Sequence, residues 1–479
     1  MGTNLLKTRT LYKKCIFVFT VLFLICLSYK SVYCEDAFLV KCMKIAESRD
    51  PKLMAAHEQV QLSRSRTIRA ARSLFPQVMI QHTNSKGKTA MASDISGYEY
   101  IGESYGVKAA QALYEGYRTR GSYEYESMMV TASKYNYTKT REELFSKIKL
   151  AYYEYLTLKR EAQTLGKAHE IVVGLFDKVK KEYKARAISQ LDLLEAENFK
   201  DRITDMYEAA KINYDFSIKK LVSLVGIIDI KDVNVQPLDM LSDNVPEISF
   251  TLDSLMGLVL TNNLDVQTAK IQTEMAEMKI KINRSKVIPK FYIEGFYGRS
   301  GEAFTTAPLD LTTSWNVVGK LSWGLWGNSL EASYTQDKTD PKTIIDASKR
   351  IDTQTQDIKF SLLDDLEYFV ESKESDVSFN QTNADYVETL KTKRLDTEKA
   401  YNDYLNSLNN ARTLKKEIAL RERKLALMKK RNALYEVQTV SLMEEAWKYA
   451  EAIASYAKAT YQNYASVTEM EKLTLTPLR

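Results

Sequence analysis

The chain has 479 residues, of which 44% are hydrophobic and 27% are charged, with only 8 prolines and 17 glycines. This composition is typical of a folded protein and excludes wholesale disorder. The formal net charge is +6, but the segment 1–34 holds five lysines and arginines and no acid. The rest of the chain is therefore close to neutral, with one more basic than acidic side chain, and this near balance argues against a nucleic-acid partner.

Residues 1–34 have the order of an export signal, with a basic start, an apolar run over residues 16–27 and a polar end. We expect the mature chain to begin near Glu35 and to work outside the cytoplasm. A lipid-anchored Cys34 is the alternative, although the bulky Tyr33 before it fits a lipidation motif poorly.

Glycine and proline are excluded from helix interiors, so their placement marks where helices stop. Apolar residues three and four apart predict helices within 36–75, 122–225 and 252–287. After Gly327 the chain has no glycine, and its prolines in this tract lie near the two ends. We therefore expect very long helix over 328–479.

Two pairs of segments interrupt the helical pattern and read as strands, 77–85 with 105–114 and 290–299 with 313–326. The last segment alternates apolar and polar residues, which favours a barrel wall between lipid and water. A soluble hairpin packed on a helix is the alternative. After the export signal, no run reaches the roughly 18–20 apolar residues of a membrane-spanning helix. Three tryptophans are expected at a membrane interface: Trp315, Trp323 and Trp326.

These blocks repeat, because Pro76 and Pro289 differ in number by 213, whereas Ser189 and Ser441 differ by 252. The larger second offset predicts an insertion in the long helix of the second repeat, at about 370–410, that folds out sideways. The predicted organisation is an export signal (1–34), a first repeat (35–227), an equatorial linker (228–251) and a second repeat (252–479). The first repeat has a strand hairpin (77–114) and a helical turn near 186–189. The second has a strand hairpin (290–326) and a helical turn near 438–441.

Helix lengths suggest how each repeat is built. At about 1.5 Å per residue, helices 36–75 and 190–225 together match the continuous helix 122–185, giving a rod on the order of 100 Å. Four strands per chain cannot close a barrel, and an open sheet in lipid would leave backbone groups unpaired at several kcal/mol each. Closure therefore requires several chains.

Side chains for catalysis are scarce. The three histidines, His57, His82 and His169, are isolated, and no nucleotide, dinucleotide, serine-hydrolase or zinc-protease signature occurs. Three of the four cysteines lie in the export signal, so Cys42 alone remains for the mature chain. We expect neither an enzyme nor a cofactor or metal site.

From Asp36 to about Leu475 the chain resembles the TolC-type outer-membrane efflux proteins. The resemblance rests on the two repeats, the apolar run before Pro76 or Pro289, the segment 113–118 leading into helix, and the turn pattern of Tyr183, Ser189 and Asp192. It implies a mainly α fold with a small β part: a homotrimer whose twelve-stranded transmembrane β-barrel, four strands per chain, continues into an α-helical coiled-coil barrel. The expected location is the cell outer membrane, with a helical extension into the periplasm.

The function implied by the resemblance is a passive exit duct of a tripartite efflux or type I secretion system. An inner-membrane transporter would drive transport through a periplasmic adaptor, and drugs, metals and polypeptides remain open as cargo. A non-channel periplasmic coiled-coil protein is the alternative. The resemblance places the adaptor contacts at the helical turns: Ala187, Ile188, Ser189, Thr439, Val440 and Ser441.

Asp192 and Glu444 match acidic positions at the turns, and threefold symmetry would make each a ring of charges at a pore constriction. A carboxylate at a helix N-terminus is also stabilised by the helix dipole, and we expect Ser189 and Ser441 to cap the following helices. Departures from the family pattern argue against its salt-bridge lock, because Val440 replaces a basic gate residue. Family turns usually carry glycine at the positions of Arg186 and Gln438.

Overall fold

The computed structural model describes residues 36–91, 94–233, 245–304, 308–339, 352–434 and 436–478. The predicted export signal and the middle of the linker lie outside these ranges. The chain divides into two compact units. The helical unit comprises Met1–Asp50, Glu142–Leu255 and Thr397–Arg479, and the sheet unit comprises Pro51–Arg141 and Met256–Asp396.

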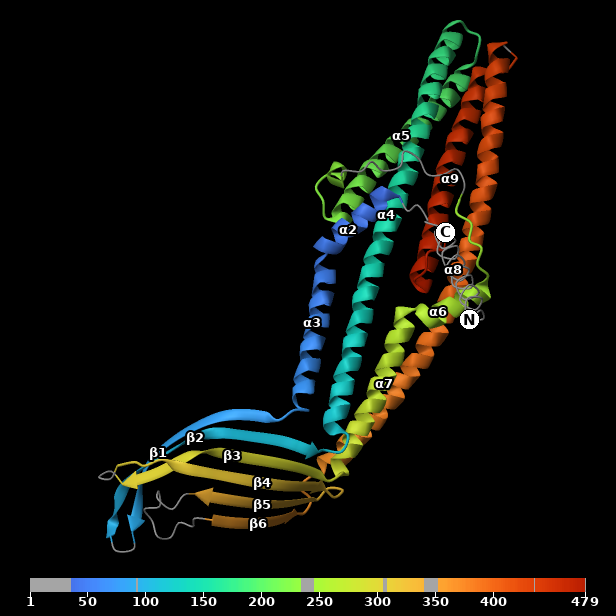
Figure 1. The fold of residues 1–479 in the computed structure, drawn as a ribbon. Coiled ribbons are helices and arrows are strands. Elements are labelled where there is room, and N and C mark those ends of the chain that lie inside the picture. Colours follow the sequence, from blue (N-terminus) through green and yellow to red (C-terminus); the bar gives the residue numbers. More distant parts are fainter. Residues whose placement is uncertain are drawn as a thin grey trace, which may run out of the picture. The chain divides into compact units, whose positions relative to one another are not determined.

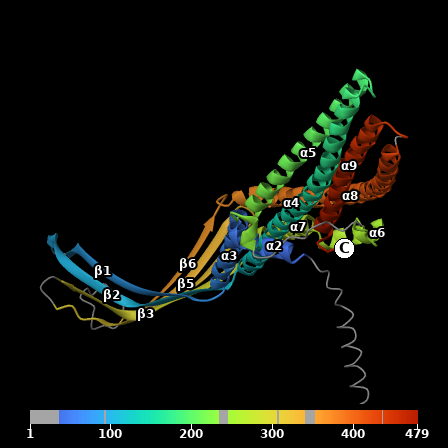
Figure 2. The ribbon, with the colours of Figure 1, turned by 90° about the horizontal axis from the view of Figure 1, so that it is seen from above.

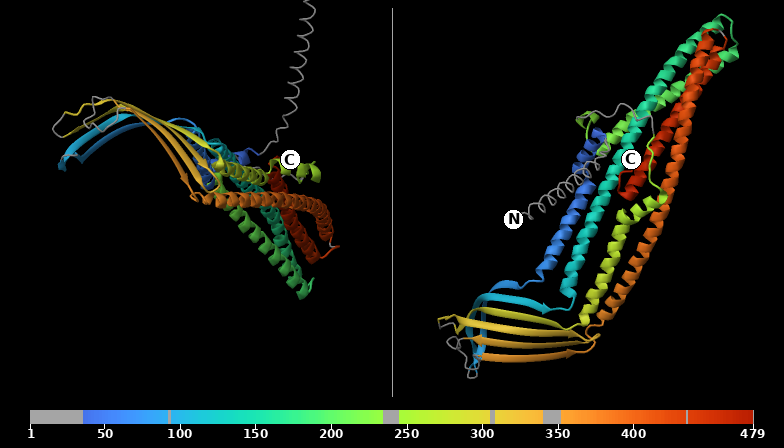
Figure 3. Two further views of the ribbon diagram at one scale, coloured as in Figure 1. Left: turned by 90° about the horizontal axis from the view of Figure 1, so that it is seen from below. Right: turned by 45° about the vertical axis from the view of Figure 1, so that its right-hand side comes forward.

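The sheet unit contains one antiparallel sheet whose described strands follow chain order from edge to edge, as Figure 1 shows. Seen from other directions, the strands form a single curved layer (Figures 2 and 3). The strands are β1 (Gln77–Met91), β2 (Asp94–Tyr114), β3 (Lys290–Phe304), β4 (Thr312–Gly324), β5 (Ser329–Thr339) and β6 (Asp352–Ser361). Each strand pairs antiparallel with the next one in sequence.

Six described strands replace the predicted four, so the expectation of four strands per chain is wrong. The expectation of helix throughout 328–479 is also wrong, because β5 and β6 lie in that tract. Lack of glycine removes a helix breaker but does not by itself favour helix. In both strands apolar side chains recur at every second position, as Leu330, Ala332 and Tyr334 do in β5. That period is the period of a strand.

The two long helices have equal lengths, which relocates the predicted insertion. Helix α4 (Arg118–Lys184) and helix α8 (Glu367–Ala433) each have 67 residues, and α8 is unbroken over 370–410. From the end of β4 to the start of α8 the chain advances 43 positions, against 4 from β2 to α4. The difference of 39 equals the difference between the two repeat offsets. The insertion is therefore the β5–β6 hairpin rather than an excursion from the helix.

The remaining helices are divided between the two units, and α4 and α8 contribute to both. In the sheet unit lie α3 (Pro51–Arg72), α7 (Leu264–Arg284) and the short 3-10 helix η2 (Ser285–Val287). The helical unit contains α2 (Ala37–Arg49), α5 (Gln190–Val225), the 3-10 helix η1 (Ile230–Val233) and α9 (Thr439–Thr474), and α6 (Leu252–Asn262) starts there. None of the described helices is long and apolar enough to cross a membrane.

The core of the helical unit is a seam of apolar side chains contributed by α4, α5 and α9. Val172 and Val179 of α4 meet Ile203 of α5 and Met443 of α9, and all four are fully buried. Alanines such as Ala446 fill other positions of the seam, and small side chains allow coiled-coil helices to approach closely. Helix α5 ends at Gly226, whose φ of 73° is the left-handed conformation that favours glycine.

Candidate functional site

One face of the sheet is apolar and exposed from the helix-linked ends of the strands to the level of Trp315, beyond which it carries polar or charged side chains such as His82 and Arg299. The strand registers place every second residue of each strand on this face, so that the apolar side chains continue from β1 to β6. Ile80 is 86% exposed, Ile358 77% and Tyr297 67%. We call it the apolar face, and its members include Val78, Ile80, Val107, Ala109, Ile293, Tyr297, Trp315, Val317, Leu321, Trp323, Leu330, Ala332, Ile358 and Phe360.

The opposite face, which we call the polar face, carries glutamine, serine, threonine and charged side chains. Glu294 of β3 lies between two lysines of the neighbouring strands. It contacts Lys108 of β2, and the Nζ of Lys320 on β4 lies 3.5 Å from its Oε2. Val318 sits on this face beside Lys320, one residue from Val317 on the apolar face.

This division of faces differs from that of a water-soluble sheet. In a soluble antiparallel sheet, the apolar face packs on a core and the polar face meets water. Here the apolar side chains have no core to cover them in the described chain, and an exposed apolar patch of this kind marks contact with lipid or with another protein. Apolar-out and polar-in alternation is the pattern of strands that separate lipid from a water-filled lumen.

The predicted interface tryptophans lie at two levels of β4. Trp315 and Trp323 are both on the apolar face and are eight residues apart, about 27 Å along a strand. Trp323 donates its indole N–H to the carbonyl oxygen of Val287 in η2 at 3.0 Å. Trp326 follows β4 in a turn, with a φ of 46° and 64% of its surface exposed. Their role at a membrane interface remains a prediction.

The first helical turn spans residues 185–189 and closes with a capping box. The Ser189 backbone N–H donates to Asp192 Oδ2 at 2.9 Å, and the Asp192 N–H donates to Ser189 Oγ at 3.1 Å. The hydrogen bond from the Ser189 backbone, with one from its hydroxyl, lowers the pKa of Asp192. Arg186 takes the left-handed conformation, φ 54°, that glycine would favour. Asp192 thus has a structural role, while its predicted pore role remains untested.

The second helical turn lies between Ala433, the end of α8, and Thr439, the start of α9, whereas it was expected near 438–441. Its hydrogen bond from the Glu436 N–H to the Arg431 carbonyl corresponds to the bond from the Ala187 N–H to the Glu182 carbonyl in the first turn. The prediction that Ser441 caps α9 is wrong, because the cap residue is Gln438, whose side chain makes no capping hydrogen bond. Thr439, Val440 and Ser441 instead form the first turn of α9, and Glu444 pairs with Lys448 at 2.5 Å.

A network of hydrogen bonds that the sequence did not predict joins α4 to the end of α8 and the start of α9. We call it the tip network, and its members are Lys178 and Glu182 of α4, Asn432 of α8 and Thr439 of α9. Lys178 Nζ donates to Asn432 Oδ1 at 2.7 Å, and Asn432 Nδ2 donates to Thr439 Oγ1 at 3.2 Å. Thr439 Oγ1 donates in turn to Glu182 Oε1 at 2.8 Å. Asn432 is 6% exposed and Thr439 2%, so these hydrogen bonds are shielded from water.

The residue after Glu444, Glu445, has a buried carboxylate that joins α9 to α8. Glu445 accepts from Lys424 Nζ at 2.6 Å and from Arg421 Nη1 at 3.2 Å, and its side chain is only 3% exposed. Burial alone would raise the pKa of Glu445, but the hydrogen bonds from Lys424 and Arg421 outweigh it and lower the pKa. Sequence reasoning chose Glu444, because both acids follow the turn and only packing distinguishes them.

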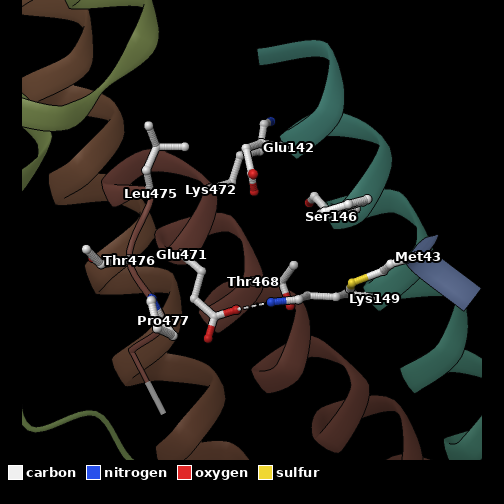
Figure 4. Close-up of a pocket in the computed structure, with 11 residues that line it drawn as sticks. Met43, Glu142, Ser146, Lys149, Thr468, Glu471, Lys472, Leu475, Thr476 and Pro477 are labelled. Atoms are coloured by element: carbon white, nitrogen blue, oxygen red, sulfur yellow. Dashed lines mark hydrogen bonds and ion pairs between the residues drawn. The ribbon is translucent and has the colours of Figure 1, made fainter. Parts of the chain in front are cut away.

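A cavity of about 340 Å³ lies between α4 and the C-terminal end of α9. Figure 4 shows Glu471 of α9 opposite Lys149 of α4, with the Nζ 3.3 Å from Glu471 Oε2. Glu471 Oε1 also accepts from the Leu478 N–H at 3.3 Å, which holds the C-terminal segment. No group of three acidic, histidine or cysteine side chains suited to a metal ion occurs in the described part of the chain.

Residues 43–226 match the family described as outer membrane efflux protein, whereas no curated protein matches the chain. Among solved structures, the outer-membrane channel OprN is 13% identical over 92% of this chain and 90% of its own, with a TM-score of 0.70. The outer membrane protein VceC of Vibrio cholerae is 11% identical over 92% and 97%, with a TM-score of 0.68. The open-state MtrE outer membrane channel of Neisseria gonorrhoeae is 14% identical over 92% and 89%, with a TM-score of 0.66.

The expected fold of long helices with a smaller β part is thus confirmed across most of the chain. The family match over residues 43–226 and this shared fold confirm the resemblance to the outer membrane efflux proteins.

Proposed function

We propose that the protein is a passive exit duct in the outer membrane. The observation that supports this function best is the sheet with an exposed apolar face and a charged polar face, which suits a wall between lipid and a water-filled lumen. The family match and the names of the solved structures, which are outer-membrane channels, support the same function.

The duct would consist of several copies, because the described sheet of one chain is open at both edges, β1 and β6, and the family resemblance sets their number at three. Unpaired strand edges in lipid cost several kcal/mol per backbone group, so further copies must complete the wall. With no nucleotide-binding motif in the sequence, the energy for transport would come from an inner-membrane transporter through a periplasmic adaptor. The adaptor would bind the helical turns at residues 185–189 and 434–441.

Opening at the turns would require α4 to separate from α8 and α9. In the described structure, the tip network holds these helices together through Asn432 and Thr439. An adaptor can favour opening only by binding the open arrangement more tightly than the closed one. A packed helical interface with two alternative arrangements is a common form of such a switch.

Purified mature protein in planar lipid bilayers tests the proposal. We expect that detergent is required to extract the protein from envelopes, that its mass corresponds to three copies, and that it forms discrete conducting channels. A water-soluble protein without conductance would contradict the duct and support the periplasmic coiled-coil protein instead.

The role of the acidic residues needs a variant that separates charge from capping. We expect Asp192→Asn combined with Glu444→Gln to raise single-channel conductance if these carboxylates ring the constriction. Ser189→Ala is the matched control, because it removes the hydroxyl of the capping box and keeps the charge of Asp192. Equal conductance in the charge variant and the wild type would show that neither carboxylate lines the pore constriction.

A further inference from the structure

We infer that the β5–β6 hairpin is part of the barrel wall, so that β6 of one copy pairs with β1 of the next and three copies close an eighteen-stranded cylinder. This inference rests on the proposed function and specifies how the duct is assembled. It concerns the insertion by which the second repeat exceeds the first, between β4 and α8.

The hairpin continues the sheet rather than lying apart from it. Eleven residue pairs join β4 to β5 and ten join β5 to β6, without a break in register. The apolar face also continues across it, with Trp323 next to Leu330 and Leu330 next to Phe360. Because β4 is paired on both sides, it can meet a neighbouring copy only by giving up all its pairs with β5.

The two free edges fit each other in direction. An even number of strands in an all-antiparallel sheet makes β6 of one copy antiparallel to β1 of the next, whatever the number of copies. Four residues separate Gln77 at the start of β1 from the end of α3, and five separate Ser361 at the end of β6 from the start of α8. We therefore align Gln77 with Ser361, so that the helix-linked ends of both strands lie at the same level.

The edges also fit each other in chemistry. This alignment places Val78 opposite Phe360 and Ile80 opposite Ile358 on the apolar face. It also places Lys86 opposite Asp352, giving an ion pair across the edge. Ile80 and Ile358 are 86% and 77% exposed, whereas Ile293 inside the sheet is 41% exposed. Matched apolar pairs across strands stabilise a sheet, and each edge supplies the cover that the other lacks.

The pairing has a consequence for the opening. Barrel diameter grows roughly linearly with strand number, so eighteen strands give a mouth about 1.5 times as wide as twelve strands. The polar face, with the lysines around Glu294, would line this wider mouth.

Disulfide cross-linking in the assembled protein tests the edge pairing. Thr83 and Thr355 face each other on the polar face in this alignment, and Cα atoms of paired strands lie within the roughly 4.4–6.8 Å span of a disulfide. We expect Thr83→Cys with Thr355→Cys to give a ladder of covalent dimers and trimers on denaturing gels, which disappears on reduction. Thr353→Cys and Asp357→Cys on the same face allow for a register shift of two residues either way.

Two matched pairs make the result decisive. Asn84→Cys with Thr355→Cys places the thiols on opposite faces and should give no ladder. Thr83→Cys with Val318→Cys tests a twelve-stranded arrangement by the same alignment, because it joins β4 of one copy to β1 of the next. A ladder from the Thr83→Cys and Val318→Cys pair would overturn the inference and leave the proposed duct intact. So would the absence of a ladder from all three β6 positions in channels that conduct. If the wild-type protein itself does not conduct, the proposed duct function is overturned.

Discussion

A lysine placed on the apolar face should destabilise the membrane-inserted protein, whereas a lysine one residue away should not. Val317 lies on the apolar face of β4, two residues from Trp315 and six from Trp323, and is 42% exposed. A lysine on a lipid-facing strand costs about 2–4 kcal/mol at the membrane midplane and about 0–1 near the interface. Two residues place Val317 roughly 7 Å along the strand from Trp315. We therefore expect Val317→Lys to cost about 2 kcal/mol per chain.

Val318→Lys is the matched control, since it adds the same side chain to the same strand on the polar face, beside Lys320. Its cost should stay below about 1 kcal/mol, because the ammonium remains in water. The free energies of unfolding come from urea titrations in phospholipid vesicles, followed by the gel mobility of unheated samples. Equal losses in the two variants would refute lipid contact by the apolar face, and a larger loss for Val318→Lys would reverse the assignment of faces.

Four further outcomes are expected in the helical unit. Asn432→Ala should lower the free energy of unfolding by about 1–3 kcal/mol, since it removes buried hydrogen bonds, and should raise open probability in bilayer recordings, whereas the exposed Asn410→Ala should do neither. Glu445→Gln should lower the urea midpoint by an amount equivalent to about 1–3 kcal/mol, because it removes the charge that two cationic partners share. Burial raises the pKa of Glu161 to about 7, so the folded state binds its proton more tightly than the unfolded state. Thermal stability should therefore fall as pH rises from about 5 to 8, and Glu161→Gln should flatten that dependence. Burial raises the pKa of the Cys42 thiol to about 12, so maleimide at pH 8 should label it only after denaturation.

The long helices were predictable because their signal is local. Apolar residues three and four apart mark the buried seam of α5, where Ile203 and Ala210 are fully buried. The absence of glycine and of interior proline allowed α8 and α9 to be recognised as long helices. These features are visible within a few turns of one segment, and tertiary contacts only reinforce them.

The β5–β6 hairpin was missed because the composition of its tract was taken as evidence for helix. A usable signal was present, since Leu330, Ala332 and Tyr334 alternate with polar residues and Pro341 follows. Ile358 and Phe360 alternate in the same way after the proline. A period of two should outweigh the absence of glycine, because a strand also lacks glycine unless its backbone bends or meets another chain closely.

The helical turns show where sequence reasoning must end, because the groups that join them are far apart in the chain. Lys178 and Asn432 are 254 residues apart, and only the packed fold brings them together. The same fold makes the two turns unequal. The first turn closes by itself, because Ser189 and Asp192 cap α5 reciprocally. Helix α9 lacks a side-chain cap, and Thr439 in its first turn is bonded to α4 through Glu182. Separation of α4 from α9 would therefore break the Thr439–Glu182 bond and leave Thr439 bonded only to Asn432 of α8, while the start of α5 keeps its whole cap. Movement at the gate should accordingly begin at the second turn.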